Sequence, residues 1–379
     1  MQQALPKPVK FAWLFGARTD LLFFYAPILF GCLLLAGEQS MLSSSALWAI
    51  VLLNALGAGP FHQGATWLSY FDPRNRAEFN STPLKRFVFF AAPLLIFFGT
   101  IAGMMIYPLA AILIFFAWSL QHIVSQNIGI LLLYHNHDSD EAVVDRRLEI
   151  RTQVMSALTF GLLFFYRAMF ESAHHEILVS APQIQLSPFT TTVVWLSYLL
   201  PLVAAIGLYT AWSIGKYFYE LNCRLQEGKA LNVPALMFWV YSIASLLPLA
   251  MLGKSFEEGN LIPSTVHWFQ YIVINYVLVK NKSGISSVAA GGIPPIPAGS
   301  GRSTRLFFLV GLLAVVCVMG TSLAAVAAGG QPKLQQLLIG IVMGFGGVHY
   351  FLDAYLWRFR EPSRRQAVLP YLLAARTKT

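Results

Sequence analysis

Residues 306–328 read LFFLVGLLAVVCVMGTSLAAVAA, a stretch of 23 residues without a charged side chain. Arg305 precedes this stretch and two glycines follow it. A helix needs about 20 consecutive apolar residues to cross the hydrocarbon core of a bilayer. The stretch therefore predicts a transmembrane helix, because a helix that is apolar on every side has no face to present to water.

Apolar stretches of this kind recur along the whole chain of 379 residues. Only 11% of the residues are charged, against about 25% in a typical soluble domain. The sequence therefore predicts an all-α, polytopic transmembrane helical bundle of about ten spans. The predicted spans are residues 21–37, 45–71, 87–106, 108–134, 150–172, 191–215, 233–252, 262–280, 305–328 and 334–357. Because the fifth span carries Arg151, Arg167 and Glu171, an interfacial amphipathic helix is its alternative interpretation.

The basic residues fall mainly on one side of these spans. If the N-terminus is cytoplasmic, 23 of the 26 Lys and Arg residues lie in cytoplasmic segments, and only Lys254 and Lys333 lie outside. Cytoplasmic loops of membrane proteins carry such an excess. The distribution predicts cytoplasmic N- and C-termini in a multi-pass protein of a bacterial inner (plasma) membrane. It also argues against nucleic acid as a partner, because the basic residues flank spans instead of forming one face.

Composition divides the chain into four predicted parts. They are an eight-span membrane body (1–280), a Gly/Pro-rich cytoplasmic linker (281–304), a two-span hairpin (305–357) and a basic cytoplasmic tail (358–379). Basic residues next to a span attract anionic lipid. Four arginines of the tail are therefore predicted to hold the last span against the bilayer: Arg358, Arg360, Arg364 and Arg365.

Four histidines lie inside predicted spans, on the second, fourth, eighth and tenth: His62, His122, His267 and His349. All four spans run from the outside to the cytoplasm in this topology. At 1.5 Å per residue, the histidines lie roughly 12–20 Å above the cytoplasmic boundary. Ionisable side chains are costly inside a bilayer and usually face a cavity, a partner or a ligand. Four imidazoles in one layer of the membrane therefore predict a metal site with nitrogen ligands.

Polar residues accompany these histidines at helical spacing. Asp353 and Gln126 follow His349 and His122 by four residues, so each shares a helix face with its histidine. A ligating histidine usually donates its second N–H to a nearby acceptor. The candidates for this supporting role, or for direct ligation in the case of the carboxylate, are Asp353, Gln126, Gln270, Tyr350 and Asn275. Thr66 and Tyr271 stand at the same spacing after His62 and His267.

Imidazole ligands suit iron, copper, zinc and nickel, and a supporting carboxylate favours non-haem iron. The predicted function is an integral membrane metalloprotein, a non-haem iron oxidoreductase or oxygenase that acts on a lipid or isoprenoid substrate. Haem is the second candidate cofactor. The alternatives are a haem-binding membrane protein, a transporter that uses the same histidines, and a scaffold in which each histidine only hydrogen-bonds between helices.

One histidine on each of four spans resembles the Brp/Blh family of bacterial membrane carotene dioxygenases, in which a histidine is followed a few residues later by an aspartate. The resemblance is carried by residues 348–353 (VHYFLD) and 61–64 (FHQG), with His122 and His267 in the two middle positions. It covers these short patches only, no aspartate lies near His62 within its span, and this chain has more predicted spans. The resemblance implies iron and an isoprenoid-like substrate.

Overall fold

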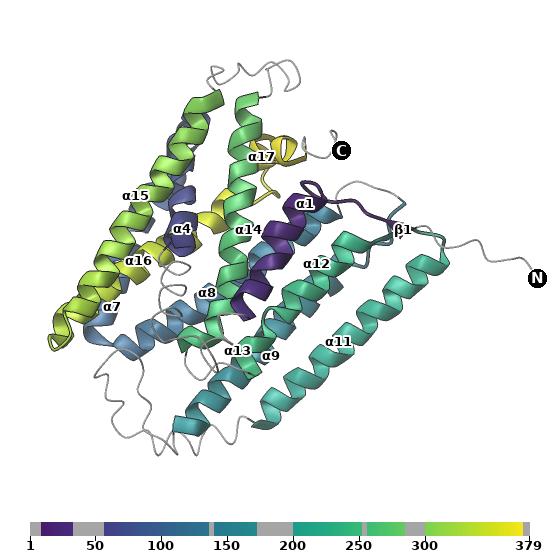
Figure 1. Ribbon diagram of the computed structural model, residues 1–379, viewed down its shortest axis with the longest axis horizontal. Helices are drawn as coiled ribbons and strands as arrows, with labels where there is room; N and C mark the ends of the chain where they lie inside the picture. The colour runs from purple at the N-terminus through teal and green to yellow at the C-terminus, as the bar shows by residue number, and fades with distance from the viewer. Residues whose placement is uncertain are drawn as a thin grey trace, which may run out of the picture. The chain divides into compact units, whose positions relative to one another are not determined.

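The computed structural model describes residues 9–32, 57–135, 140–172, 200–251, 256–284 and 300–373. Within these ranges the chain is almost entirely helical, and its only strands are the two-residue β1 and β2, which pair in parallel (Figure 1). Parts of six predicted segments lie outside the described residues: 33–37 of the first span, 45–56 of the second, 191–199 of the sixth, 252 of the seventh, 285–299 of the linker and 374–379 of the tail.

Six helical segments of the described chain are long and apolar enough to cross a membrane. They are Pro83–Ile106, Pro108–Tyr134, Arg146–Arg167, Val233–Met251, Ser303–Ala327 and Pro332–Leu356. The predicted class, a helical protein with several candidate spans, is confirmed to this extent. The ambiguous span at 150–172 is among the six, because its charged residues lie near its ends.

The chain divides into two compact units. The first comprises Met1–Leu35 and Ile123–His267, and the second comprises Ala36–His122 and Trp268–Thr379. Helices α8 and α14 each contribute residues to both units, because the division falls within them. These units do not follow the predicted division at residues 280 and 305, which concerns membrane topology and stays a prediction.

The first unit is built on α9 and the helices that pack against it. Its elements are β1 (Val9–Lys10), α1 (Ala17–Asp20), η1 (Leu21–Tyr25), the second part of α8 (Pro108–Tyr134), α9 (Arg146–Ser172), α11 (Leu200–Gln226), β2 (Leu231–Asn232), α12 (Val233–Ala244), α13 (Leu247–Met251) and the first part of α14 (Phe256–Gly284). Thr159 of α9 hydrogen-bonds to Thr210 of α11 at 2.8 Å. Such side-chain bonds hold apolar helices together where water does not drive their association.

His135 lies between two carboxylates just beyond the end of α8. Its Nε2 is 2.9 Å from Glu149 Oε1, and its Nδ1 is 3.7 Å from Glu141 Oε2. Burial by itself lowers the pKa of His135, but hydrogen bonds and electrostatic attraction from both glutamates outweigh burial and raise this pKa to about 9. The imidazolium therefore ties the segment after α8 to the first turns of α9.

This contact predicts that the stability of the first unit depends on pH. The pKa of His135 in the fold, about 9, lies above its ordinary value of 6.5, so the contribution is complete below 6.5 and is lost as pH rises through about 9. We expect the thermal unfolding midpoint in detergent to fall between about pH 7 and pH 10, and to fall less in a His135→Gln variant. Equal pH dependence in both proteins would contradict this role.

The second unit contains the helices that carry three of the four histidines of the predicted spans, His62, His122 and His349. Its elements are α4 (Gly59–Trp67), η3 (Leu68–Tyr70), α5 (Pro73–Phe79), α6 (Pro83–Arg86), η4 (Phe87–Ala91), α7 (Ala92–Ile106), the first part of α8, the rest of α14, α15 (Ser300–Ala327), α16 (Pro332–Leu356) and α17 (Pro362–Leu373). Helix α16 packs along α7, and α15 packs along α4 and α16. Since α14 extends to Gly284 and α15 begins at Ser300, the predicted linker is helical at both ends.

Small residues allow α4 and α15 to pack at close range. A Cβ added at Gly64 would lie 2.8 Å from Ala314 Cβ, 2.9 Å from the carbonyl oxygen of Val310 and 3.0 Å from Gly311 Cα. Two of these atoms belong to the backbone of α15, so they cannot turn aside. Close approach through small residues is a common way for membrane helices to associate.

Gly64→Leu is expected to push α4 away from α15. Overpacking costs about 1–3 kcal/mol, and His62 and Thr66 flank Gly64, so the substitution should also disturb the position of both side chains. Gly99→Leu is the matched control, because a Cβ at Gly99 on α7 meets no atom within 4 Å. The thermal midpoint of detergent-solubilised protein measures the effect, and equal midpoints for the two variants would contradict it.

The arginines of the tail do not share one role. Arg364 is only 2% exposed on α17, where its guanidinium donates to Asn75 Oδ1 at 3.0 Å and lies 3.1 Å from Glu78 Oε2. The prediction that Arg364 binds anionic lipid is therefore wrong. The physical reason is that Arg364 of α17 contacts α5, where Asn75 accepts a hydrogen bond from the guanidinium and Glu78 forms an ion pair with it.

Candidate metal centre

Four helices of the second unit bring ionisable side chains together. Helix α4 contributes His62 and Thr66, which stand one turn apart, and α16 contributes His349 and Asp353 at the same spacing. Helix α8 adds His122, and α14 adds a tyrosine, Tyr271. All six side chains are buried: His62, Thr66, His122, Tyr271, His349 and Asp353.

Asp353 accepts hydrogen bonds from two neighbouring helices. Its Oδ1 accepts from the hydroxyl of Tyr271 at 2.7 Å and from Thr66 Oγ1 at 3.1 Å. Its Oδ2 is 3.9 Å from His122 Nε2. Asp353 is only 5% exposed, so these contacts replace the hydrogen bonds to water that its carboxylate loses on burial. Its position is thus fixed by α4 and α14 as well as by its own helix.

His349 lies at the centre of the group. Its ring centroid is 4.5 Å from that of His62 and 4.9 Å from that of His122. Its Nδ1 is 2.6 Å from Thr66 Oγ1. His122, His349 and Asp353 each offer a ligand atom, and these atoms lie within 4.8 Å of one another. The three residues therefore form a group that could hold a metal ion.

His62 makes a local hydrogen bond that orients its ring. Its Nδ1 bonds to the carbonyl oxygen of Gly59, one turn earlier on α4. When Nδ1 carries the proton, Nε2 is the nitrogen with the lone pair that a metal uses. Histidine ligands commonly donate their other N–H to a backbone carbonyl in this way.

His267, the fourth predicted ligand, belongs to the first unit. It is 2% exposed on α14, and its backbone carbonyl accepts a hydrogen bond from Gln126 Nε2 at 3.1 Å. Gln126 thus supports the backbone of α14, and its role beside His122 stays a prediction. On α14 itself, His267 stands one turn before Tyr271 and so shares its helix face.

The other predicted supporting residues belong to the second unit. Tyr350 donates to Ser119 Oγ at 3.1 Å, and its ring lies 4.6 Å from that of His122 between centroids. Asn275 is buried, and its Nδ2 donates to the carbonyl oxygen of Tyr271 at 3.0 Å. Gln270 is buried on α14. Tyr350 therefore lies against a candidate ligand, and Asn275 supports the backbone beneath Tyr271.

Thr66 and Tyr271 belong to the site, although no role was predicted for them from the sequence. Both stand four residues after a histidine, which was the available signal, but threonine and tyrosine at that spacing are common in membrane helices. Their role depends on α4, α14 and α16 meeting, which no local pattern predicts. In the fold, the two hydroxyls are 2.9 Å apart, and both contact Asp353 Oδ1.

Comparison with protein-family models, with curated proteins and with solved structures gives no match. The resemblance to the carotene dioxygenases therefore rests on the short motifs around His62 and His349 and stays a prediction.

Proposed function

We propose that this chain is an integral membrane metalloprotein, a non-haem iron oxidoreductase or oxygenase that acts on a lipophilic substrate. The observation that carries the proposal is the convergence of His122, His349 and Asp353 within apolar helices. Two histidines and one carboxylate are the donor set typical of non-haem iron oxygenases. Iron in such a set supplies oxidation chemistry with dioxygen.

His62 and His267 complete the proposed ligand set. The ring of His62 lies against that of His349, and its Nδ1 is engaged by Gly59, so its Nε2 is the proposed ligand atom. His267 is included because it shares a face of α14 with Tyr271, which contacts Asp353. Tyr271 and Thr66 hold the carboxylate in place, a supporting role that metal sites generally need.

The spacing of the rings favours a compact ion over haem. A haem needs a flat space between its two axial ligands. Here the ring centroid of His349 is only 4.5 Å from that of His62 and 4.9 Å from that of His122. The hydrogen-bonded Asp353 beside them also suits a hard metal ion such as iron. Haem remains the second candidate cofactor.

A transporter is the second candidate function. Buried ionisable groups inside membrane helices mark ion pathways as well as metal sites. Under this alternative, Asp353 and the histidines would carry a cation or protons instead of holding a fixed ion. Stable metal that survives purification distinguishes the two functions.

We further propose the ten-span topology with both termini in the cytoplasm of a bacterial inner membrane. The excess of Lys and Arg in alternate loops supports it. In a cysteine-free background, Gln331→Cys should react with an impermeant maleimide in intact cells, because the turn between α15 and α16 is proposed to lie outside. Arg360→Cys should react only after permeabilisation. The reverse pattern would overturn the orientation.

The experiment that tests the proposed function is metal analysis of the detergent-purified protein together with its visible spectrum. Iron near one per chain without a Soret band supports the proposal, and lipophilic substrates are then tested with dioxygen consumption as the readout. A Soret band would replace the proposal with a haem protein. Protein that is free of metal after gentle purification would favour transport.

A further inference from the structure

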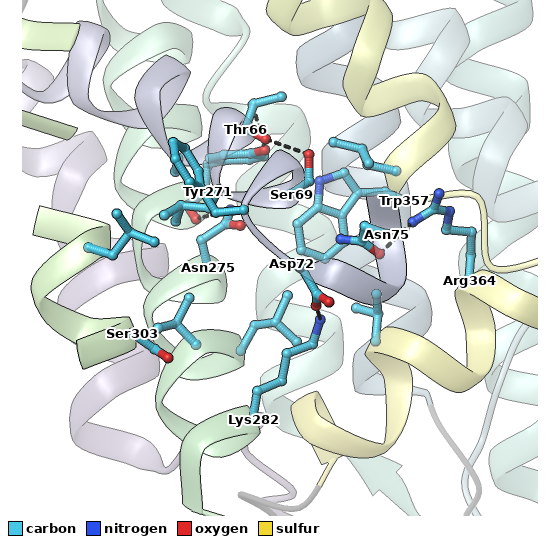
Figure 2. Close-up of a pocket in the computed structure, with 18 of the residues that line it drawn as sticks. Thr66, Ser69, Asp72, Asn75, Tyr271, Asn275, Lys282, Ser303, Trp357 and Arg364 are labelled. Carbon is cyan, nitrogen blue, oxygen red and sulfur yellow. Dashed lines mark hydrogen bonds and ion pairs between the residues drawn. The ribbon is translucent and has the colours of Figure 1, made fainter. Parts of the chain in front are cut away.

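A cavity of about 160 Å³ lies beside the candidate metal centre in the second unit (Figure 2). Thr66 and Tyr271 line one end of this cavity, and Asp72 and Lys282 line the other. The hydroxyls of Thr66 and Tyr271 both bond to Asp353 Oδ1. A molecule in the cavity would therefore lie one side chain away from a candidate metal ligand.

Most of the cavity wall is apolar. Leu68 follows α4, Leu278 and Val279 come from α14, Leu306 comes from α15 and Leu356 from α16. The cavity is partly open instead of fully enclosed. An engineered cavity of about 150 Å³ with apolar walls takes up benzene, so this space suits a polar group and the first few carbons of a chain. The rest of a longer molecule would have to leave through the open side.

The polar end offers more hydrogen-bond donors than acceptors. Asp72 Oδ1 accepts from the backbone N–H of Arg74 at 2.9 Å, and Oδ2 accepts from Lys282 Nζ at 3.2 Å. Asn75 Oδ1 accepts from Arg364 at 3.0 Å. The acceptors therefore already have donors. The ammonium of Lys282 carries three N–H donors, of which Asp72 takes one.

We propose that this cavity binds the anionic end of an amphipathic, fatty-acid-like carboxylate. A carboxylate oxygen would accept from Lys282, and the adjacent carbons would lie against the apolar wall between Lys282 and Tyr271. As a binding site the cavity stands on its own geometry. That the bound molecule is the substrate rests on the proposed function, because Thr66 and Tyr271 separate the cavity from Asp353.

The test uses the full chain in nanodiscs of zwitterionic lipid. The probe is a long-chain fatty acid with a photoreactive diazirine close to its carboxylate, and the labelled peptides are mapped by mass spectrometry. We expect label on α14 and α15 around Leu278 and Leu306. The unlabelled fatty acid should compete about tenfold better than the alcohol or the trimethylammonium of the same chain length. Uniform label on lipid-facing helices, or equal competition by all three, would overturn the proposal.

Two variants and one matched control locate the site. Lys282→Met removes the proposed partner of the carboxylate, and Leu306→Trp fills the cavity from α15. Each should weaken probe labelling about tenfold or more. Lys280→Met is the control, because Lys280 is exposed two residues earlier on α14 and does not line the cavity. Wild-type labelling in both Lys282→Met and Leu306→Trp would overturn the proposal.

Metal content of the same samples separates this inference from the proposed function. Specific labelling of a protein that holds no metal would support the carboxylate site and contradict the proposed oxygenase function. A metal-loaded protein without specific labelling would support the metal centre and contradict the carboxylate site.

Discussion

His349→Ala is expected to abolish the proposed metal binding. His349 stands between His62 and His122, and it shares a group of candidate ligand atoms with His122 and Asp353. Loss of a supporting residue in a metal site typically costs roughly 10–100-fold in affinity, and loss of a central ligand should cost more. Metal per chain, measured after size-exclusion chromatography, gives the result, and substrate oxidation should be lost with it.

Two further variants make this result specific. Thr66→Val removes a hydroxyl that contacts both His349 and Asp353, so it should weaken metal binding by roughly 10–100-fold without abolishing it. Tyr350→Phe breaks only the bond to Ser119 and should keep the metal. Full metal content in monodisperse His349→Ala protein would mean that His349 is not a ligand.

Arg364→Met is expected to destabilise the protein by about 3 kcal/mol, at the lower end of the range for breaking a buried ion pair. Arg364 is 2% exposed and stands between Asn75 and Glu78. Its guanidinium also lies over the ring of Phe79, 5.1 Å from the ring centroid. The low end applies because Glu78 keeps a side-chain exposure of 16%, so water can partly solvate it when the arginine is gone.

The neighbouring Arg365→Met is the control for this effect, because Arg365 is exposed on the same helix. Thermal unfolding in detergent should separate the two variants clearly. Adding Glu78→Gln to Arg364→Met should recover part of the loss, since it removes the charge of a carboxylate that has lost Arg364 and keeps only Lys85, at 3.3 Å, and the hydroxyl of Ser363 as partners. If Arg364→Met and Arg365→Met unfold at the same temperature, the ion pair does not stabilise the fold.

The sequence was informative where the relevant spacing is local. His349 and Asp353, one turn apart on α16, were expected to share a face, and both lie in the candidate metal centre. The rings of His62, His122 and His349 also lie against one another, whereas their common depth in a bilayer stays a prediction. Helical periodicity and the length of a span are sufficient for such predictions.

Contacts between distant segments could not be predicted in this way. Arg364 looked like its neighbours in a basic tail, and its partner Asn75 stands 289 positions earlier. The hydrogen bond from Gln126 to the backbone carbonyl of His267 likewise joins residues 141 positions apart. In both cases a polar side chain bonds to another helix. Whether such a side chain finds its partner on its own helix or on a neighbouring one depends on the packing of the whole unit.

The hydroxyl of Thr66 also determines the direction in which protons are shared around His349. Thr66 has one hydroxyl proton and three partners, which are Asp353 Oδ1, the hydroxyl of Tyr271 and His349 Nδ1. While that proton goes to Asp353 or to Tyr271, only a lone pair of Thr66 faces His349. The proton of this contact then has to come from His349 Nδ1, which selects one of the two neutral tautomers of the imidazole and leaves Nε2 to bind a metal. The hydroxyl of Thr66 on α4 thereby determines which nitrogen of His349 on α16 is available to a metal. Serine at position 66 would preserve this choice, whereas valine would leave the ring free to adopt either form.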